Sequence, residues 1–159
     1  MILEKKTERL TPQQAKPKIE HYCNYQERCH QEVSNKLYEY GLNTDDVNQL
    51  LSHLVKSKLL NEERFAIAFA GGKFRQKHWG KNKIIRELKM RKVSDFCIKK
   101  GLKEIDDTDY EKTLRHLAEK YNHTLKDKLK YIRQQKVLKH LVNKGYEYEL
   151  CLELLNEIL

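Results

Sequence analysis

The segment VSNKLYEYGLNTDDVNQLLSHL (residues 33–54) occurs three times, in altered form, along this 159-residue chain. It aligns without gaps with IIRELKMRKVSDFCIKKGLKEI (residues 84–105) and with VLKHLVNKGYEYELCLELLNEI (residues 137–158). Apolar residues coincide in six columns: Val33, Ile84 and Val137; Leu37, Leu88 and Leu141; Leu42, Val93 and Tyr146; Val47, Ile98 and Cys151; Leu51, Leu102 and Leu155; Leu54, Ile105 and Ile158. A repeat of this period is typical of stacked helical units that share a core.

Within each unit, the spacing of these columns predicts two helices joined by a tight turn. The first two columns are four residues apart and the last three are spaced by four and three, so each set lies on one helix face. Gly41 and Gly145 stand where the first helix would end in a left-handed residue. The second unit has Lys92 in this column, so we expect either a strained lysine or a different turn there. The candidate N-caps of the second helix are Asn43, Thr44 and Ser94.

A further helix is predicted before each pair, at about residues 13–27, 61–77 and 108–122. The predicted fold is therefore all-α, with three tandem three-helix repeats that form an elongated, curved array. Apolar residues make up 39% of the chain and charged residues 35%, which suits thin helical layers better than one thick globule. The expected boundaries are a flexible tail at residues 1–12 and repeats at 13–60, 61–106 and 107–159. Gly71 and Gly72 fall inside the second lead helix, where we expect a bend or an early end.

The composition points to a cytoplasmic protein. The chain has no apolar run of 18 residues, and its N-terminus lacks the apolar core of a signal peptide, so we expect no membrane span and no export. The four cysteines follow no C-x-x-C spacing, and in a reducing compartment they are expected to be free thiols that fill the core. They are Cys23, Cys29, Cys97 and Cys151.

No catalytic or metal site is expected. The residue types of a zinc site occur at His21, Cys23, Cys29 and His30. However, His21 and Cys23 are two residues apart on a predicted helix and point in different directions. Asp106 and Asp107 are expected to begin a helix rather than to hold a metal. Because no nucleophile elbow, phosphate-binding loop or zinc-protease motif is present, we predict no enzyme activity and no cofactor.

Positive charge is concentrated in the middle of the chain. The protein has 32 Lys and Arg against 23 Asp and Glu, a net charge of +9, yet residues 73–103 alone hold twelve bases and only two acids, Glu87 and Asp95. On a helix from Lys81 to Lys92, the bases would project opposite an apolar face. So many cations without acidic partners favour binding to a polyanion or an acidic partner over a merely solvated face. The residues expected to bind are Lys73, Arg75, Lys77, Lys81, Lys83, Arg86, Lys89 and Arg91.

Two neighbouring features have more than one interpretation. Trp79 precedes the basic helix, where its indole would either stack on an exposed base or pack inside the protein; we favour packing for a lone tryptophan. A second basic run includes Lys126, Lys128, Lys130, Arg133, Lys136 and Lys139, with only Asp127 among them. This run would either extend the same binding surface or form a solvated face.

The segment NEERFAIAFAGGKFRQKHWGKNKIIRELKMRKV (residues 61–93) resembles the most recognisable part of RecX proteins. The pattern is an acidic residue before E-R-F-A-x-x-F, a basic stretch, a glycine and a basic R-x-E-L helix. It is matched by Glu62, Glu63, Arg64, Phe65, Ala66, Phe69, Lys73, Arg75, Lys77, Gly80, Arg86, Glu87 and Leu88. The chain departs from it at Lys92, where the family usually has glycine, and at Gly71 and Gly72, where longer side chains are usual. The resemblance covers residue 13 to the C-terminus.

This resemblance implies a regulator that lies in the helical groove of the RecA filament on single-stranded DNA, limits filament growth and lowers ATP-driven strand exchange. The implied partners are the RecA filament and single-stranded DNA, with no membrane, and we expect a monomer without chemistry of its own. Two other classes stay open. A DNA-binding transcription module would insert one helix into the major groove of duplex DNA. A small helical nuclease would need a carboxylate cluster, which the sequence lacks.

Overall fold

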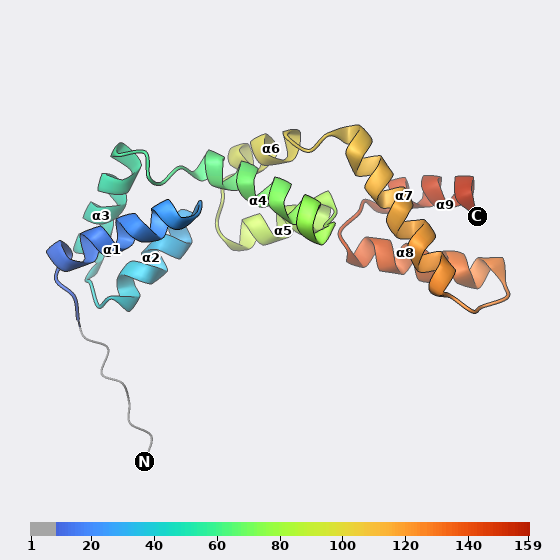
Figure 1. The fold of residues 1–159 in the computed structure, drawn as a ribbon, viewed down its shortest axis with the longest axis horizontal. Helices are drawn as coiled ribbons and strands as arrows, with labels where there is room; N and C mark the ends of the chain where they lie inside the picture. Colours follow the sequence, from blue (N-terminus) through green and yellow to red (C-terminus); the bar gives the residue numbers. More distant parts are fainter. Residues whose placement is uncertain (1–8) are drawn as a thin grey trace, which may run out of the picture. The chain divides into compact units, whose positions relative to one another are not determined.

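The computed structural model describes residues 9–159, which contain nine α-helices and no strand (Figure 1). The helices are α1 (Pro12–Tyr25), α2 (His30–Glu39), α3 (Thr44–Lys56), α4 (Glu62–Lys77), α5 (Lys81–Met90), α6 (Asp95–Lys103), α7 (Asp107–Thr124), α8 (Lys130–Asn143) and α9 (Tyr148–Ile158). They follow one another as three sets of three, so the predicted all-α repeat fold is confirmed. Most of the tail expected at residues 1–12 lies outside the described range.

The aligned apolar columns form the core. The first four columns are buried in all three repeats, whereas Leu51, Leu102 and Ile158 in the last two columns are half-buried. Packing divides the chain into two compact units. The first unit holds the described residues up to Phe65 together with Arg91–Val93, and the second unit holds Ala66–Met90 and Ser94–Leu159.

The turns inside the repeats follow the predicted chemistry. Gly41 and Gly145 have φ values of 88° and 102°, and each lets the next apolar residue donate its N–H to a carbonyl of the preceding helix. Lys92 has a φ of 57°, so the lysine adopts the strained conformation itself. Asn43 and Ser94 cap α3 and α6 with their side-chain oxygens, whereas Thr44 is the first residue of α3.

Helix α4 runs through both of its glycines to Lys77, so of the bend or early end expected at Gly71 and Gly72, the early end is wrong. Ala70 and Phe74, on either side of the glycine pair, are buried. Their packing outweighs the cost of about 1 kcal/mol that each glycine adds in a helix interior. The neighbouring helix α6 also approaches closely, since a Cβ on Gly101 would lie 2.6 Å from the Ala66 carbonyl oxygen.

Within the second unit, the backbone joins repeats two and three directly. The N–H of Gly80 donates to the Lys144 carbonyl at 2.8 Å, and the N–H of Asn82 donates to the Gly145 carbonyl at 2.9 Å. A Cβ on Gly80 would overlap the Gly145 carbonyl carbon, so only glycine fits here. The C-terminal carbonyls at the end of α8 thus satisfy N–H groups at the start of α5, which places opposite ends of two helix dipoles together.

Aromatic side chains complete this join. The Tyr110 ring packs between Phe74 and Tyr146, with centroid separations of 5.8 and 5.1 Å. The Tyr110 hydroxyl accepts the Lys81 N–H at 2.9 Å and donates to Glu147 Oε1 at 2.5 Å. Burial and the hydrogen bond to Glu147 raise the pKa of Tyr110, which keeps the hydroxyl protonated as a donor. Repeats two and three therefore form one packed body.

Several chemical features can be located in the described part of the chain. The four cysteines are buried free thiols. No group of three His, Cys, Asp or Glu side chains within residues 9–159 is arranged to hold a metal ion. The helices of this range are all too short or too polar to cross a membrane.

Candidate nucleic-acid interface

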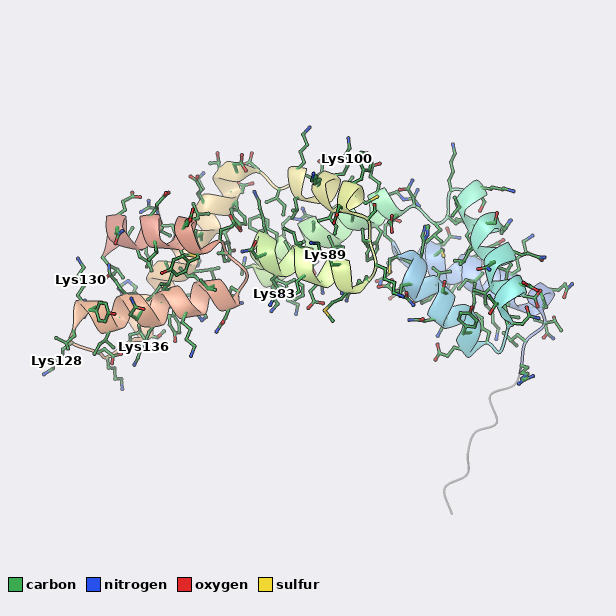
Figure 2. All side chains as sticks on the ribbon, turned by 180° about the vertical axis from the view of Figure 1, so that it is seen from behind. Lys83, Lys89, Lys100, Lys128, Lys130 and Lys136 are labelled. Carbon is green, nitrogen blue, oxygen red and sulfur yellow. The ribbon has the colours of Figure 1, made fainter. Side chains whose placement is uncertain are left out.

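Helix α5 forms the centre of the predicted binding surface. Ile84 and Leu88 are fully buried, whereas Arg86 and Lys89 are exposed. This two-sided pattern fixes the helix on the core and turns its charges to solvent. Figure 2 shows Lys83 and Lys89 on α5, Lys100 on α6, and Lys128, Lys130 and Lys136 around the start of α8.

Trp79 is half-buried, and its ring contacts two of the predicted cations. Its indole meets the Phe69 ring edge to face, with centroids 6.3 Å apart. The ammonium groups of Lys73 and Lys83 lie 5.1 and 4.6 Å from the indole centroid. Such cation–π contacts hold flexible lysines in place while leaving their charge intact. The structure therefore favours the packing interpretation of Trp79, and the indole positions the two lysines.

Two of the eight predicted residues have carboxylate partners. Lys81 Nζ lies 3.5 Å from Asp107 Oδ1 and 4.6 Å from the Tyr110 ring centroid, which ties this lysine to the third repeat. Arg91 belongs to the first unit, where its Nε lies 3.8 Å from Glu32 Oε1. These two residues are therefore partly neutralised, and Arg91 belongs to a different packed unit from the other seven.

The other six predicted residues keep their charge available. Lys73, Arg75, Lys77, Lys83, Arg86 and Lys89 make no ion pair within 4.0 Å in the described part of the protein. All six belong to α4 and α5 of the second unit. Arg75 lies across the helix backbone, because a Cβ on Gly71 would come within 2.6 Å of its Nη1 atom. We call these six residues the α4–α5 cation set.

Helix α6 contributes a feature that was not among the residues predicted to bind. Phe96 is 64% exposed, and the Lys100 ammonium lies 5.5 Å from its ring centroid. The signal was present in the sequence, since Phe96 falls outside the face that carries Cys97, Ile98 and Gly101. An exposed aromatic ring beside a cation is a common element of nucleic-acid surfaces.

The second basic run forms a separate surface at the start of α8. Lys128, Lys130 and Tyr131 are exposed, and Lys136 Nζ pairs with Asp127 Oδ2 at 2.9 Å. The end of α8 contacts the start of α5, so the 14 residues of α8 place Lys130 about 21 Å from the join. The second unit thus carries two cationic regions whose separation is fixed by one helix.

Comparison with known proteins identifies two domain types in the chain. Residues 61–102 match the family model described as RecX, second three-helix domain, and residues 108–155 match RecX, third three-helix domain. The chain is 34% identical over 122 residues to a regulatory protein RecX of Clostridium perfringens, which covers 76% of this chain and 57% of that protein. It is 29% identical over 131 residues to one of Lactococcus lactis, which covers 80% of this chain and 49% of that protein. The chain thus spans about half the length of these curated relatives.

Solved structures share the same fold. The crystal structure of RecX from Lactobacillus salivarius superposes with a TM-score of 0.83 and covers 92% of this chain and 96% of that one, at 20% identity. A second crystal structure, of a regulatory protein RecX, gives a TM-score of 0.82 and covers 92% of this chain and 73% of that one. At this sequence identity, the structural similarity shows the fold alone.

Proposed function

Because the chain belongs to the RecX family of regulatory proteins, we propose that it binds the RecA filament on single-stranded DNA and inhibits filament extension, ATPase and strand exchange. In this proposal it acts in the cytoplasm as a monomer, through binding alone, without an enzyme activity, a metal or a cofactor. The family names of the similar proteins support a regulatory role, and the six charges of the α4–α5 cation set support the choice of an anionic partner.

The observation that carries the proposal is the unpaired charge of this cation set. Six cations without carboxylate partners repel one another unless a partner supplies negative charge. A filament on single-stranded DNA offers phosphates and repeated acidic surfaces along its groove. The join at Gly80 and Gly145 keeps the set in a fixed relation to the α8 surface, so little order has to be gained on binding.

The test is the ATPase activity of RecA on single-stranded DNA with the protein added at a ratio far below one. We expect inhibition by the unmodified chain and weaker inhibition by the double variant Arg86→Glu and Lys89→Glu. Both residues are exposed, so the circular dichroism of the variant should match that of the parent. Lys83 is left unchanged because its Cβ region packs against Gly145 and its ammonium lies over Trp79.

A matched control tests whether the loss of inhibition comes from this surface or from the change in net charge. The variant Lys56→Glu and Lys120→Glu changes two exposed lysines on α3 and α7 and lowers the net charge by the same amount. It should inhibit RecA like the parent. Equal loss of inhibition in both double variants would reject the α4–α5 surface, and no inhibition by the parent would reject the proposed function. Tight, sequence-selective binding to duplex DNA would instead support the transcription-module alternative.

A further inference from the structure

The first unit contains a groove of about 530 Å³ that the proposed function does not use. Its walls come from α1, from the loop after it and from the C-terminal end of α2. The side chains that matter below are Lys18, His21, Tyr22, Tyr25, Arg28 and Tyr40, which we call the tyrosine groove. None of the described residues that line it is a carboxylate.

One stripe of α1 builds most of this groove. Lys18, His21, Tyr22 and Tyr25 are spaced at three, four and seven residues, so they lie along one side of the helix. The buried residues Ala15, Ile19 and Cys23 occupy a different face and hold α1 on the core. Tyr22 also packs in part against this core, whereas Tyr25 at the end of the stripe is 77% exposed.

Arg28 is fixed over the Tyr22 ring. Its guanidinium carbon lies 3.7 Å from the Tyr22 ring centroid, and its Nε donates to the Tyr22 carbonyl at 3.1 Å. Lys36 lies 5.7 Å from the ring centroids of both Tyr22 and Tyr40. The groove thus combines flat aromatic rings with preorganised cations at its edge.

Each carboxylate of α1, α2 and the loop between them contacts a basic side chain, and the partner of Glu39 is Lys36 at the edge of the groove. The contacts are Glu20 with His53, Glu27 with Arg64, Glu32 with Arg91, and Glu39 with Lys36. Lys18 and Arg28 make no ion pair within 4.0 Å in the described residues. The groove consequently faces solvent with aromatic rings and surplus positive charge.

We propose that the tyrosine groove is a second contact for single-stranded nucleic acid, in which an unpaired base stacks on Tyr25 while Lys18 and Arg28 meet the phosphates. Aromatic rings accept any base, and neighbouring cations track the backbone. A proline-rich peptide would also use aromatic rings, but it would leave the cations without a counter-charge. This inference rests on the proposed function in taking single-stranded DNA as the ligand, and it adds a contact to the bases as well as to the phosphates.

The test uses fluorescence anisotropy with two fluorescein-labelled probes of equal length, a 20-residue oligothymidylate and a 20-residue oligonucleotide of abasic sites. Loss of one stacking contact is expected to weaken binding of Tyr25→Ala to oligothymidylate about tenfold, since stacking contributes about 1–3 kcal/mol per base. Binding to the abasic probe should be unchanged. Tyr25→Phe retains the ring and should bind like the parent. Tyr38→Ala removes an exposed tyrosine of α2 that does not line the groove and should have no effect.

The outcomes separate this inference from the proposed function. Unchanged oligothymidylate binding by Tyr25→Ala, or an equal loss on both probes, overturns the tyrosine groove as a base contact. Tyr25-dependent binding that is seen only with a decaproline peptide overturns it as well. In each of these cases, inhibition of RecA that still depends on Arg86 and Lys89 leaves the proposed function standing. If the parent protein does not inhibit RecA but Tyr25→Ala still weakens binding to oligothymidylate alone, the groove is retained as a base contact and the proposed function is rejected.

Discussion

Lys92 holds a backbone conformation that glycine adopts without strain. Its φ of 57° costs a residue with a Cβ about 1–2 kcal/mol. We therefore predict that Lys92→Gly raises the free energy of unfolding by about 1 kcal/mol, because relief of strain exceeds the entropy that glycine adds to the unfolded chain. Urea unfolding followed by circular dichroism measures this change.

Arg86→Gly is the matched comparison, because Arg86 is exposed in the middle of α5. It should lower the free energy of unfolding by about 1 kcal/mol. If both substitutions destabilise the protein equally, the left-handed conformation at Lys92 is not a source of strain.

At this scale, the sequence predicted backbone chemistry better than side-chain environments. Gly41 and Gly145 were recognised as turn residues because the alignment placed each one between two helices. The surroundings of Trp79 and Lys81 were not predictable, since Phe69, Tyr110 and Asp107 reach them only through the packing of different helices. Single-sequence periodicity gives the face of a residue but not its neighbours on another element.

The start of α5 depends on the end of α8, and glycine makes this contact possible. We predict that Gly80→Ala destabilises the second unit by about 1–3 kcal/mol, because the new methyl group overlaps the backbone of Gly145 and Tyr146. Thermal unfolding measures the effect. Gly72→Ala is the control: a Cβ at Gly72 meets nothing within 4 Å, so it should stabilise α4 by about 0.5–1 kcal/mol. A neutral Gly80→Ala would contradict the described join.

The pair of α7 and α8 provides a pH-dependent contact. Tyr121 and His140 stack with ring centroids 4.0 Å apart, and burial, with a smaller effect of Lys144, lowers the pKa of His140 from 6.5. The unfolded chain therefore binds the proton more readily than the folded protein. The stabilisation is complete above pH 6.5 and is lost as the pH falls below it.

We predict that His140→Phe, which keeps an aromatic ring against Tyr121, makes the thermal midpoint less sensitive to acidification from pH 7.5 to pH 5.5. The comparison is between the slopes of thermal midpoint against pH of the parent and the variant, so a uniform difference in stability does not affect it. Parallel slopes would show that His140 protonation does not contribute.

At the element scale, the sequence located the nine helices of residues 9–159 but not the ends that depend on other repeats. The expected early end of α4 was wrong because the buried residues beside Gly71 and Gly72 hold the helix together. The tyrosine groove was also missed. Its stripe on α1 is visible as a spacing, but the partners that complete it, Arg28 and Tyr40, reach α1 only through the packing of the following loop and helix.

The whole molecule has two packed units, and the second contains two repeats that share one join. Leu37 in the first unit and Leu141 in the second are both fully buried, and replacing either with alanine costs about 2–5 kcal/mol. Because the Gly145 carbonyl and the Tyr110 hydroxyl accept the N–H groups of Asn82 and Lys81, damage to the third repeat should release the start of α5.

Hydrogen–deuterium exchange followed by mass spectrometry distinguishes the units. Leu141→Ala should accelerate exchange in α7, α8, α9 and at the start of α5, while the peptides of α1 keep the parent's rate. Leu37→Ala should accelerate exchange in α1, α2 and α3 and leave Lys81 and Asn82 protected. The hydrogen bonds of Lys81 and Asn82 hold the start of α5, and with it the α4–α5 cation set, in position. Leu141→Ala should therefore also weaken RecA inhibition more than Leu37→Ala does. Acceleration throughout the chain by either variant would mean that the protein opens as one cooperative body, and the join would then confer no special order on the cation set.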